Sequence, residues 1–312
     1  MMNNQPLVSV PIITYNSSKT ILETLESIKA QTYPNIELII SDDCSNDNTV
    51  EICQQWIDKN RDRFVRTLVL VSPINTGVSG NCNRSNEACV GEWIKCIAGD
   101  DALLPICIEE FVKYVNQYPD TLYVFCKMEG FGCQQETVDD IMCHSFDYTF
   151  FNLSAREQYS YLVLKRNCIP APTAFYNRVN TKSEVFANDE RIPMIEDYPK
   201  WMNITKSGVQ LRFLDKTLVR YRISENSIST TTTPSLKTKQ SIALIYIFYL
   251  FKARFKYHKS PIKKLGEVRK YIHYSSQVYG GFWWRFLIKL DYMIAKFLNL
   301  LGCKIKITTL KH

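Results

Sequence analysis

The stretch Ile36-Glu37-Leu38-Ile39-Ile40-Ser41-Asp42-Asp43 passes from an almost continuous apolar run into two carboxylates. Such a run is typical of a strand that is buried on both faces of a parallel sheet. Residues 7–13 form a similar run, and apolar residues recur at helical spacing between Ile21 and Ile28. A strand, a helix and a second strand in this order predict a βαβ unit.

The same alternation continues to about residue 130 and predicts an α/β fold, a mostly parallel sheet with helices on its faces. Further strands are expected at Thr67–Val71, Trp93–Ile97 and Leu122–Cys126. Thr20 and Glu23 have the spacing of a capping box at the start of the first helix. Between residues 134 and 180 the pattern weakens, and we expect loops and short helices there.

The second half of the chain changes in character. A helix is expected at Glu196–Lys206, followed by two short strands, Val209–Leu214 and Thr217–Tyr221. Residues 227–234, rich in Ser and Thr, are typical of a linker. Beyond them the sequence predicts only helices, at Lys237–His258, Ile262–Val278 and Phe282–Leu301. We therefore divide the chain into a sheet domain at 1–230 and a helical region at 231–312.

Charge is distributed unevenly along the 312 residues, which carry a net charge of +7. Residues 251–312 hold fourteen Lys and Arg against two acidic residues, a local charge of +12, which leaves −5 for the first 250. A basic end favours an anionic partner, either a membrane surface, a nucleic acid or an acidic protein. We expect no nucleic acid to bind, because the aromatic residues of this end lie within apolar helical faces.

The eleven cysteines include no C-x-x-C pair, which favours reduced thiols in a cytosolic protein over a disulfide framework or a zinc site. The first residues lack a basic segment followed by an apolar one, so no signal peptide is expected. The longest apolar run, Ile242–Phe251, has ten residues, whereas a membrane span needs about 20. We expect no transmembrane segment.

Polar clusters follow four of the expected strands, at the edge where parallel sheets bind ligands. They are Thr14-Tyr15-Asn16, Ser41–Asp47, Asn75–Asn81 and Gly99-Asp100-Asp101. Adjacent carboxylates suit Mg²⁺ or Mn²⁺, which prefer oxygen ligands and often bridge to phosphates. The chain lacks G-x-G-x-x-G after the first strand and has no P-loop sequence. These residues predict a metal-dependent site for a nucleoside diphosphate, although each acid alone could simply cap a turn.

The ordered motifs resemble family 2 glycosyltransferases of the GT-A fold. The resemblance rests on Ser9–Asn16, Gln31–Thr49, Asn75–Gly80, Ala88–Asp101, Ile195–Tyr198 and Val219–Ile223, and spans about residues 7 to 230. It implies an enzyme that moves a sugar, with inversion, from a nucleoside-diphosphate sugar to an acceptor hydroxyl, and a UDP-sugar is the donor we expect. Domain 1–230 would then carry donor binding and catalysis.

The resemblance also implies roles for single residues. Tyr15 would stack on the base, Asp43 would accept its imide N–H, Asp100 would bind Mn²⁺ or Mg²⁺, and Asp197 would be the general base. The remaining donor-binding candidates are Thr14, Asn16, Asp42, Asn75, Gly77, Arg84 and Asp101.

Three positions depart from the family pattern. The first Asp of the family's Asp-x-Asp motif is Ala98, and the His that some members place after Tyr-Arg is Ser224. The Arg often found after the Val-Ser-Gly segment is Cys82, with Arg84 as a candidate substitute. These departures leave one alternative open, a non-catalytic protein that binds sugar nucleotides through a degenerate metal site.

The expected helix at Phe282–Leu301 places Arg285, Lys289, Lys296 and Asn299 on one face of an otherwise apolar segment that begins with two Trp. That composition is typical of a helix lying on an anionic lipid surface. A helix packed on the catalytic domain or on a dimer partner is the alternative. We expect an enzyme attached peripherally to the inner face of the cytoplasmic membrane, acting on a lipid-linked or polysaccharide acceptor.

Overall fold

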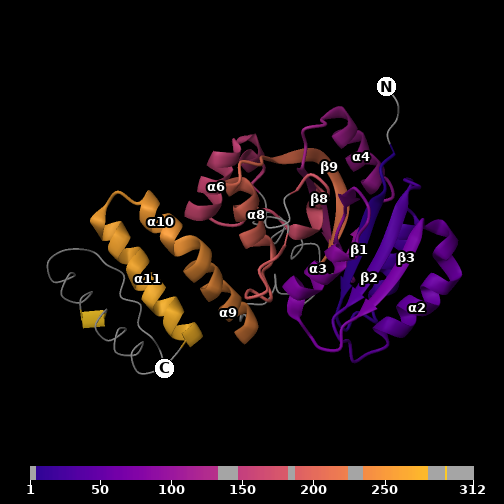
Figure 1. Ribbon diagram of the computed structural model, residues 1–312, viewed down its shortest axis with the longest axis horizontal. Helices are drawn as coiled ribbons and strands as arrows, with labels where there is room; N and C mark the ends of the chain where they lie inside the picture. The colour runs from indigo at the N-terminus through magenta and orange to yellow at the C-terminus, as the bar shows by residue number, and fades with distance from the viewer. Residues whose placement is uncertain (1–4, 133–146, 182–186, 224–234, 280–291, 294–312) are drawn as a thin grey trace. The chain divides into compact units, whose positions relative to one another are not determined.

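The computed structural model describes residues 5–132, 147–181, 187–223, 235–279 and 292–293. The chain divides into two compact units, Met1–Pro234 and Ser235–His312 (Figure 1). The first unit contains the sheet. The second contains helices.

Within the described residues, nine strands form one sheet with the order β3-β2-β1-β4-β8-β7-β9-β6, and β5 pairs with β1. The strands are β1 (Val8–Thr14), β2 (Ile36–Asp42), β3 (Arg66–Val71), β4 (Trp93–Ile94), β5 (Ile97–Ala98), β6 (Ala102–Leu103), β7 (Tyr123–Phe131), β8 (Ala174–Asn177) and β9 (Leu211–Arg222). Strands β1, β2, β3, β4 and β5 pair in parallel, as do β7 and β9. The predicted α/β class with a mostly parallel sheet is confirmed.

Three helices share one hydrophobic core with the sheet. Helices α1 (Ile21–Lys29), α2 (Thr49–Asn60) and α4 (Cys107–Gln117) bury their apolar stripes against side chains such as Val10 and Leu38. Helix α3 (Gly77–Glu87) is different, because its buried residues are small or polar and it packs on β1 and β2 (Figure 1). Small side chains let this helix approach the strand ends closely.

Strand β8 corrects the expectation that residues 134–180 hold only loops and short helices. It is four residues long, fully buried, and pairs antiparallel with both β4 and β7. A strand this short has no readable period. The same region contains η2 (Tyr148–Asn152), η3 (Ala171–Thr173) and α6 (Ala155–Leu164). The N-terminus of α6 has a true capping box, Ser154 with Glu157, which the sequence shows plainly.

The two strands expected at Val209–Leu214 and Thr217–Tyr221 are one strand, β9. The register against β7 shifts at Lys127, and the polar pair Asp215-Lys216 occupies this irregularity without ending the strand. The capping box expected at Thr20 is also wrong. The Thr20 hydroxyl donates to the Gly99 carbonyl at 2.8 Å and does not cap α1. Helix α8 (Asp197–Lys206) follows the prediction closely and lies beside α6 (Figure 1).

The second unit is a helical hairpin in its described part. Helix α9 (Leu236–Ile245) continues through a π-helical turn, η4 (Tyr246–Leu250), into α10 (Phe251–Tyr257), and α11 (Pro261–Tyr279) returns alongside. The Tyr246 hydroxyl donates to the Glu267 carboxylate, and the Tyr246 ring lies beside the Tyr274 ring at a tilt, with centroids 4.8 Å apart. The chain holds no described helix that is long and apolar enough to cross a bilayer. Most of the helix expected at Phe282–Leu301, and the whole 227–234 linker, lie outside the described residues.

Candidate active site

The structure brings the predicted strand-end residues together at one edge of the sheet. Thr14 and Asp42, the last residues of β1 and β2, are direct register partners. Ala98 at the end of β5 pairs with Ile13, so Gly99 and the two aspartates that follow leave the sheet at the same edge.

Asp42 is buried and its carboxylate is bound by the protein itself. Its Oδ2 accepts from the Thr14 hydroxyl at 2.9 Å and from the Ser45 hydroxyl at 2.5 Å, and its Oδ1 accepts from the Ser45 N–H at 2.8 Å. Asn16, which has a positive φ of 52°, accepts from the Asn46 N–H at 2.8 Å through its side-chain oxygen. These bonds join the β1 and β2 loops into one rigid corner.

Asp43 is bound still more completely. Its Oδ1 accepts from the Thr76 N–H at 3.0 Å and the Thr76 hydroxyl at 2.6 Å, and its Oδ2 accepts from the Gly77 N–H at 2.7 Å. Arg84 forms an ion pair with Oδ1 at 3.1 Å and also donates to Ser41 and Asn81. The Arg84 guanidinium therefore fixes Asp43 and the start of α3.

Position 77 requires glycine, both for its backbone conformation and for the lack of space around it. Its φ is +78°, and a Cβ atom there would lie 2.9 Å from the Pro193 carbonyl oxygen. The N–H of Ser79 donates to the same oxygen at 3.3 Å. The start of α3 is thus held against the segment that leads into α8.

Tyr15 and Asn75, two other predicted donor ligands, are exposed at the same loops. The Tyr15 side chain is 48% exposed, which leaves its ring accessible for stacking. Asn75 immediately precedes the Thr76–Gly77 turn that binds Asp43.

The Asp100–Asp101 pair contrasts with the Asp42–Asp43 corner. Asp100 is exposed, whereas Asp101 is 1% exposed and accepts the Arg222 N–H on Oδ1 at 2.9 Å. Its buried Oδ2 accepts no hydrogen bond from any residue that the structure describes. Burial and the charge of Asp100 together raise the pKa of Asp101 well above its ordinary value.

This pair fits a divalent cation. An unsatisfied buried carboxylate oxygen beside a second, accessible carboxylate is an oxygen donor set of the type that Mg²⁺ and Mn²⁺ bind. Among residues in the described ranges, no group of three or more His, Cys, Asp or Glu is arranged to hold a metal. The protein would therefore supply only part of a coordination shell here.

Arg222 at the end of β9 is a site residue to which the sequence reasoning assigned no role. Its Nε donates to the Asp100 carbonyl at 2.8 Å, and its guanidinium also pairs with Glu23. The guanidinium carbon lies 4.3 Å from the centre of the Phe131 ring. The Tyr221-Arg222 dipeptide belongs to the motif at the end of the family resemblance, and its position beside Asp100 could have been inferred from that.

Asp197 begins α8, as expected, and is half-buried. Its Oδ2 accepts from the Asn167 side chain at 2.7 Å and its Oδ1 from the Tyr198 N–H at 2.8 Å. Burial raises the pKa of Asp197, and these two bonds oppose the rise. The neighbouring Glu196 has a pKa of about 8, raised first by burial and then by the charge of Asp197.

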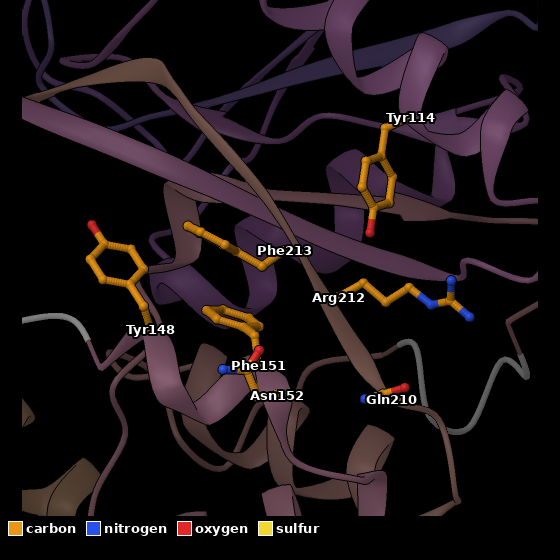
Figure 2. Close-up of a pocket in the computed structure, with 7 residues that line it drawn as sticks. All are labelled: Tyr114, Tyr148, Phe151, Asn152, Gln210, Arg212 and Phe213. Carbon is orange, nitrogen blue, oxygen red and sulfur yellow. The ribbon is translucent and has the colours of Figure 1, made fainter.

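A cavity of 420 Å³ lies elsewhere in the first unit and shares no residue with this edge. It is lined by Tyr114, Tyr148, Phe151, Asn152, Gln210, Arg212 and Phe213 (Figure 2). The Phe151 and Phe213 rings stack on each other at 4.8 Å, and the Tyr114 hydroxyl faces Arg212. The cavity contains none of the predicted site residues, so the candidate site is the strand-end edge.

The Glycosyl transferase family 2 profile matches residues 9–178, more than half of the chain. The chain belongs to this family. It is 28% identical over 72% of its length to the UDP-Glc:alpha-D-GlcNAc-diphosphoundecaprenol beta-1,3-glucosyltransferase WfaP of Escherichia coli, of which it covers 80%. It is 26% identical over 73% of its length to the putative teichuronic acid biosynthesis glycosyltransferase TuaG of Bacillus subtilis, of which it covers 84%.

Solved structures confirm the GT-A-type fold of this family 2 glycosyltransferase. TarS 1–349 of S. aureus in complex with UDP matches with a TM-score of 0.55 at 17% identity, covering 96% of this chain and 76% of that one. The mannosyltransferase PcManGT of Pyrobaculum calidifontis, with GDP-Man and Mn²⁺, matches with a TM-score of 0.55 at 14% identity, covering 96% and 84%. Its membership of the family makes the chain a glycosyltransferase, and the family match and the relatives support a nucleotide-sugar donor.

Proposed function

We propose that this glycosyltransferase is an inverting enzyme that requires Mn²⁺ or Mg²⁺ and transfers one sugar from a UDP-sugar to a lipid-linked or polysaccharide acceptor. The observation that carries the proposal is the Asp100–Asp101 pair at the strand-end edge, where a buried oxygen of Asp101 is left unsatisfied by the residues in the described ranges. A cation bound there would neutralise negative charge on the donor diphosphate. Water and that diphosphate would supply the ligands that the protein lacks.

The proposed reaction is a single displacement. The acceptor hydroxyl oxygen attacks the anomeric carbon from the side opposite the diphosphate, and the carbon–oxygen bond to the diphosphate breaks. Asp197 takes the acceptor proton as the new bond forms, while the Asn167 amide holds the carboxylate in position at 2.7 Å. Attack from the opposite side inverts the anomeric configuration.

The donor candidates have distinct proposed roles. Tyr15 stacks on the base, and Asp43, fixed by Arg84, recognises its edge. Thr14, Asn16 and Asp42 hold the loops after β1 and β2 in place below the base of the donor. Asn75 and Gly77 bring backbone close to the donor. We assign donor binding and catalysis to residues 1–230 and attachment to residues 231–312.

Two observations support a lipid-linked acceptor at the inner face of the cytoplasmic membrane. WfaP, by its name, acts on an acceptor that carries diphosphoundecaprenol. Around the turn between α10 and α11, at the end of one helix and the start of the next, the apolar side chains of Phe255, Tyr257 and Ile262 are exposed. Exposed lysines surround them in sequence, at Lys252, Lys256, Lys259 and Lys263. Apolar and basic side chains mixed on one exposed segment suit an anionic lipid surface.

The test of the enzymatic proposal is a panel of UDP-, GDP- and dTDP-sugars, screened by thermal shift with Mn²⁺ and then offered with undecaprenyl-diphosphate-linked sugars. We expect one UDP-sugar to stabilise the protein and to be transferred, with EDTA abolishing transfer. NMR of the product should show the anomeric configuration inverted. A retained configuration, or binding without turnover on any acceptor, contradicts the proposal.

The test of membrane attachment is sedimentation with vesicles of phosphatidylglycerol and phosphatidylcholine. The full-length K252E/K256E variant should bind several-fold more weakly than the wild type. The matched control, K29E/K59E, makes the same charge change at exposed lysines of the first unit and should bind normally. Equal binding by all three proteins contradicts attachment through this turn.

A further inference from the structure

Lys200 is a buried cation on the same helix as Asp197. It follows Asp197 by three residues and Glu196 by four, a spacing that places the three side chains on one face of α8. The residue is only 6% exposed. Its ammonium nitrogen lies 4.5 Å from the centre of the Tyr176 ring on β8 and 5.9 Å from that of Trp201. Burying a lysine is costly unless anionic or aromatic groups compensate its charge.

Acidic groups from three parts of the fold lie close enough to Lys200 to act on its pKa. Glu196 and Asp197 come from α8, Cys82 from α3, and Cys96 from the link between β4 and β5. The Cys82 thiol hydrogen-bonds the Cys96 sulfur, which raises the pKa of Cys82 and lowers that of Cys96. Burial lowers the pKa of Lys200, and all four acidic neighbours oppose this.

The interaction also acts in the other direction. Burial raises the pKa of both Glu196 and Asp197, and the charge of Lys200 lowers both. Besides Lys200, the groups that act on the Asp197 carboxylate include the Asn167 amide and the N–H groups of Asp197 and Tyr198. Among these groups of the described part of the chain, Lys200 is the one that carries a positive charge. Cys82, where many family members have an arginine, brings no positive charge to this place.

We propose that Lys200 is a positioning residue for glycosyl transfer: its buried ammonium group compensates Asp197 and Glu196 and keeps Asp197 in the ionised form that accepts the acceptor proton. This inference rests on the proposed function, in which Asp197 is the general base. Lys200 acts through Asp197 and is not assigned a contact with substrate.

The proposal fixes the sign of a pH effect. A general base works only when it is ionised, so activity falls as pH drops through its pKa. Without the ammonium group, the Asp197–Glu196 pair binds a proton more tightly, and the acid limb of the kcat/KM profile moves to higher pH. When that limb moves up by one pH unit, kcat/KM on the acid side falls about tenfold. A purely structural role would lower activity by one factor at every pH.

The experiment measures kcat/KM and donor KM from pH 5.5 to 9 for the wild type and for Lys200→Met, which keeps the length of the side chain without its charge. We expect the acid limb to move up by about one pH unit, a roughly tenfold loss on the acid side, with near-normal activity at pH 9 and unchanged donor KM. Lys206→Met changes an exposed lysine in the last turn of α8 and should leave the profile unchanged.

Lys200→Arg keeps the charge and should keep the wild-type acid limb, so the proposal remains testable if Lys200→Met does not fold. An unchanged limb in Lys200→Met, a uniform loss across pH, or a displaced limb in Lys200→Arg overturns the proposal. Asp197→Asn separates the two hypotheses. If that variant turns over normally, the base assignment fails, whereas an inactive Asp197→Asn beside a Lys200→Met with the wild-type limb removes only the role of Lys200.

Discussion

Two Asp-Asp pairs lie at strand ends on the same edge of the sheet, but their carboxylates differ in hydrogen bonding and burial. At Asp42–Asp43, both carboxylates accept hydrogen bonds from loops, and Arg84 adds an ion pair. At Asp100–Asp101, one carboxylate is exposed and the other has a buried oxygen that finds no partner within the described part of the chain. The carboxylates of the first pair are held in place by hydrogen bonds from the chain itself. The carboxylates of the second pair have oxygen atoms that remain available to a ligand such as the proposed cation.

The difference shows why identical dipeptides in a sequence do not have identical roles. A carboxylate that is fully hydrogen-bonded stabilises the native state, because losing it leaves buried donors unsatisfied. A desolvated carboxylate without partners costs stability and persists where a ligand uses it. Substitutions at the two pairs should therefore differ most clearly in their effect on stability.

The largest effect is expected from Asp100→Asn. Loss of one charge from the proposed cation site should lower transfer by about 10²–10³-fold, in the range of other lost electrostatic contacts to a transition state. The free energy of unfolding should barely change, since the side chain is exposed. Steady-state kinetics and urea unfolding of the same preparation measure both. An unfolding change above about 1 kcal/mol would assign Asp100 to the fold instead.

Asp43→Asn, unlike Asp100→Asn, should lower the free energy of unfolding. The amide cannot accept all of the bonds that Thr76, Gly77 and Arg84 now donate, so unfolding should become easier by about 1–3 kcal/mol. Urea denaturation measures this loss. Asp58→Asn, at an exposed ion pair with Arg61, is the matched control and should change little. A stable Asp43→Asn variant would contradict the distinction between the pairs.

A third carboxylate sharpens the comparison by its pH dependence. Burial alone would raise the pKa of Glu37, but bonds from Ser9, from the Val90 and Gly91 N–H groups and from Arg66 outweigh it and lower the pKa below 4.5. The unfolded state therefore takes up the proton first. The stability that Glu37 contributes is present above pH 4.5 and is lost as pH falls through its folded pKa.

Glu37→Gln should accordingly cost about 1 kcal/mol or somewhat more near pH 7, and its unfolding free energy should fall less steeply below pH 4.5. Urea unfolding at pH 3.5, 4.5 and 7 tests this. Parallel pH dependence in the variant and the wild type would mean that Glu37 does not behave as a carboxylate satisfied by the fold.

The sequence predicts the elements that have a clear period and the polar residues that end them. Strands β1, β2 and β3 and helices α1 and α8 follow from apolar patterning, and the meeting of Thr14, Asp42 and Asp100 at one edge follows from parallel pairing. Strand β8 is too short to show a period, and β9 looked like two strands because Asp215-Lys216 interrupts its apolar pattern.

The hydrogen bonding and burial of individual side chains could not be predicted from the sequence. The hydrogen bonds that the Asp43 carboxylate accepts come from residues 33 to 41 positions away in the sequence. The Asp101 oxygen that lacks a donor among the described residues is buried beside β9. In the sequence Lys200 resembles an ordinary surface lysine of a helix, whereas the structure buries it with its ammonium group against Tyr176 of β8. Its i+3 and i+4 spacing from Asp197 and Glu196 was the one visible signal.

The most direct test of the difference between the two pairs is calorimetric titration of UDP into the wild type and Asp100→Asn, each with Mn²⁺ and with EDTA. We predict that Mn²⁺ tightens UDP binding to the wild type at least tenfold, about 1.4 kcal/mol, and that Asp100→Asn loses most of this gain. Equal UDP affinity of the wild type in Mn²⁺ and EDTA, or the full gain in Asp100→Asn, would contradict a cation site at Asp100–Asp101.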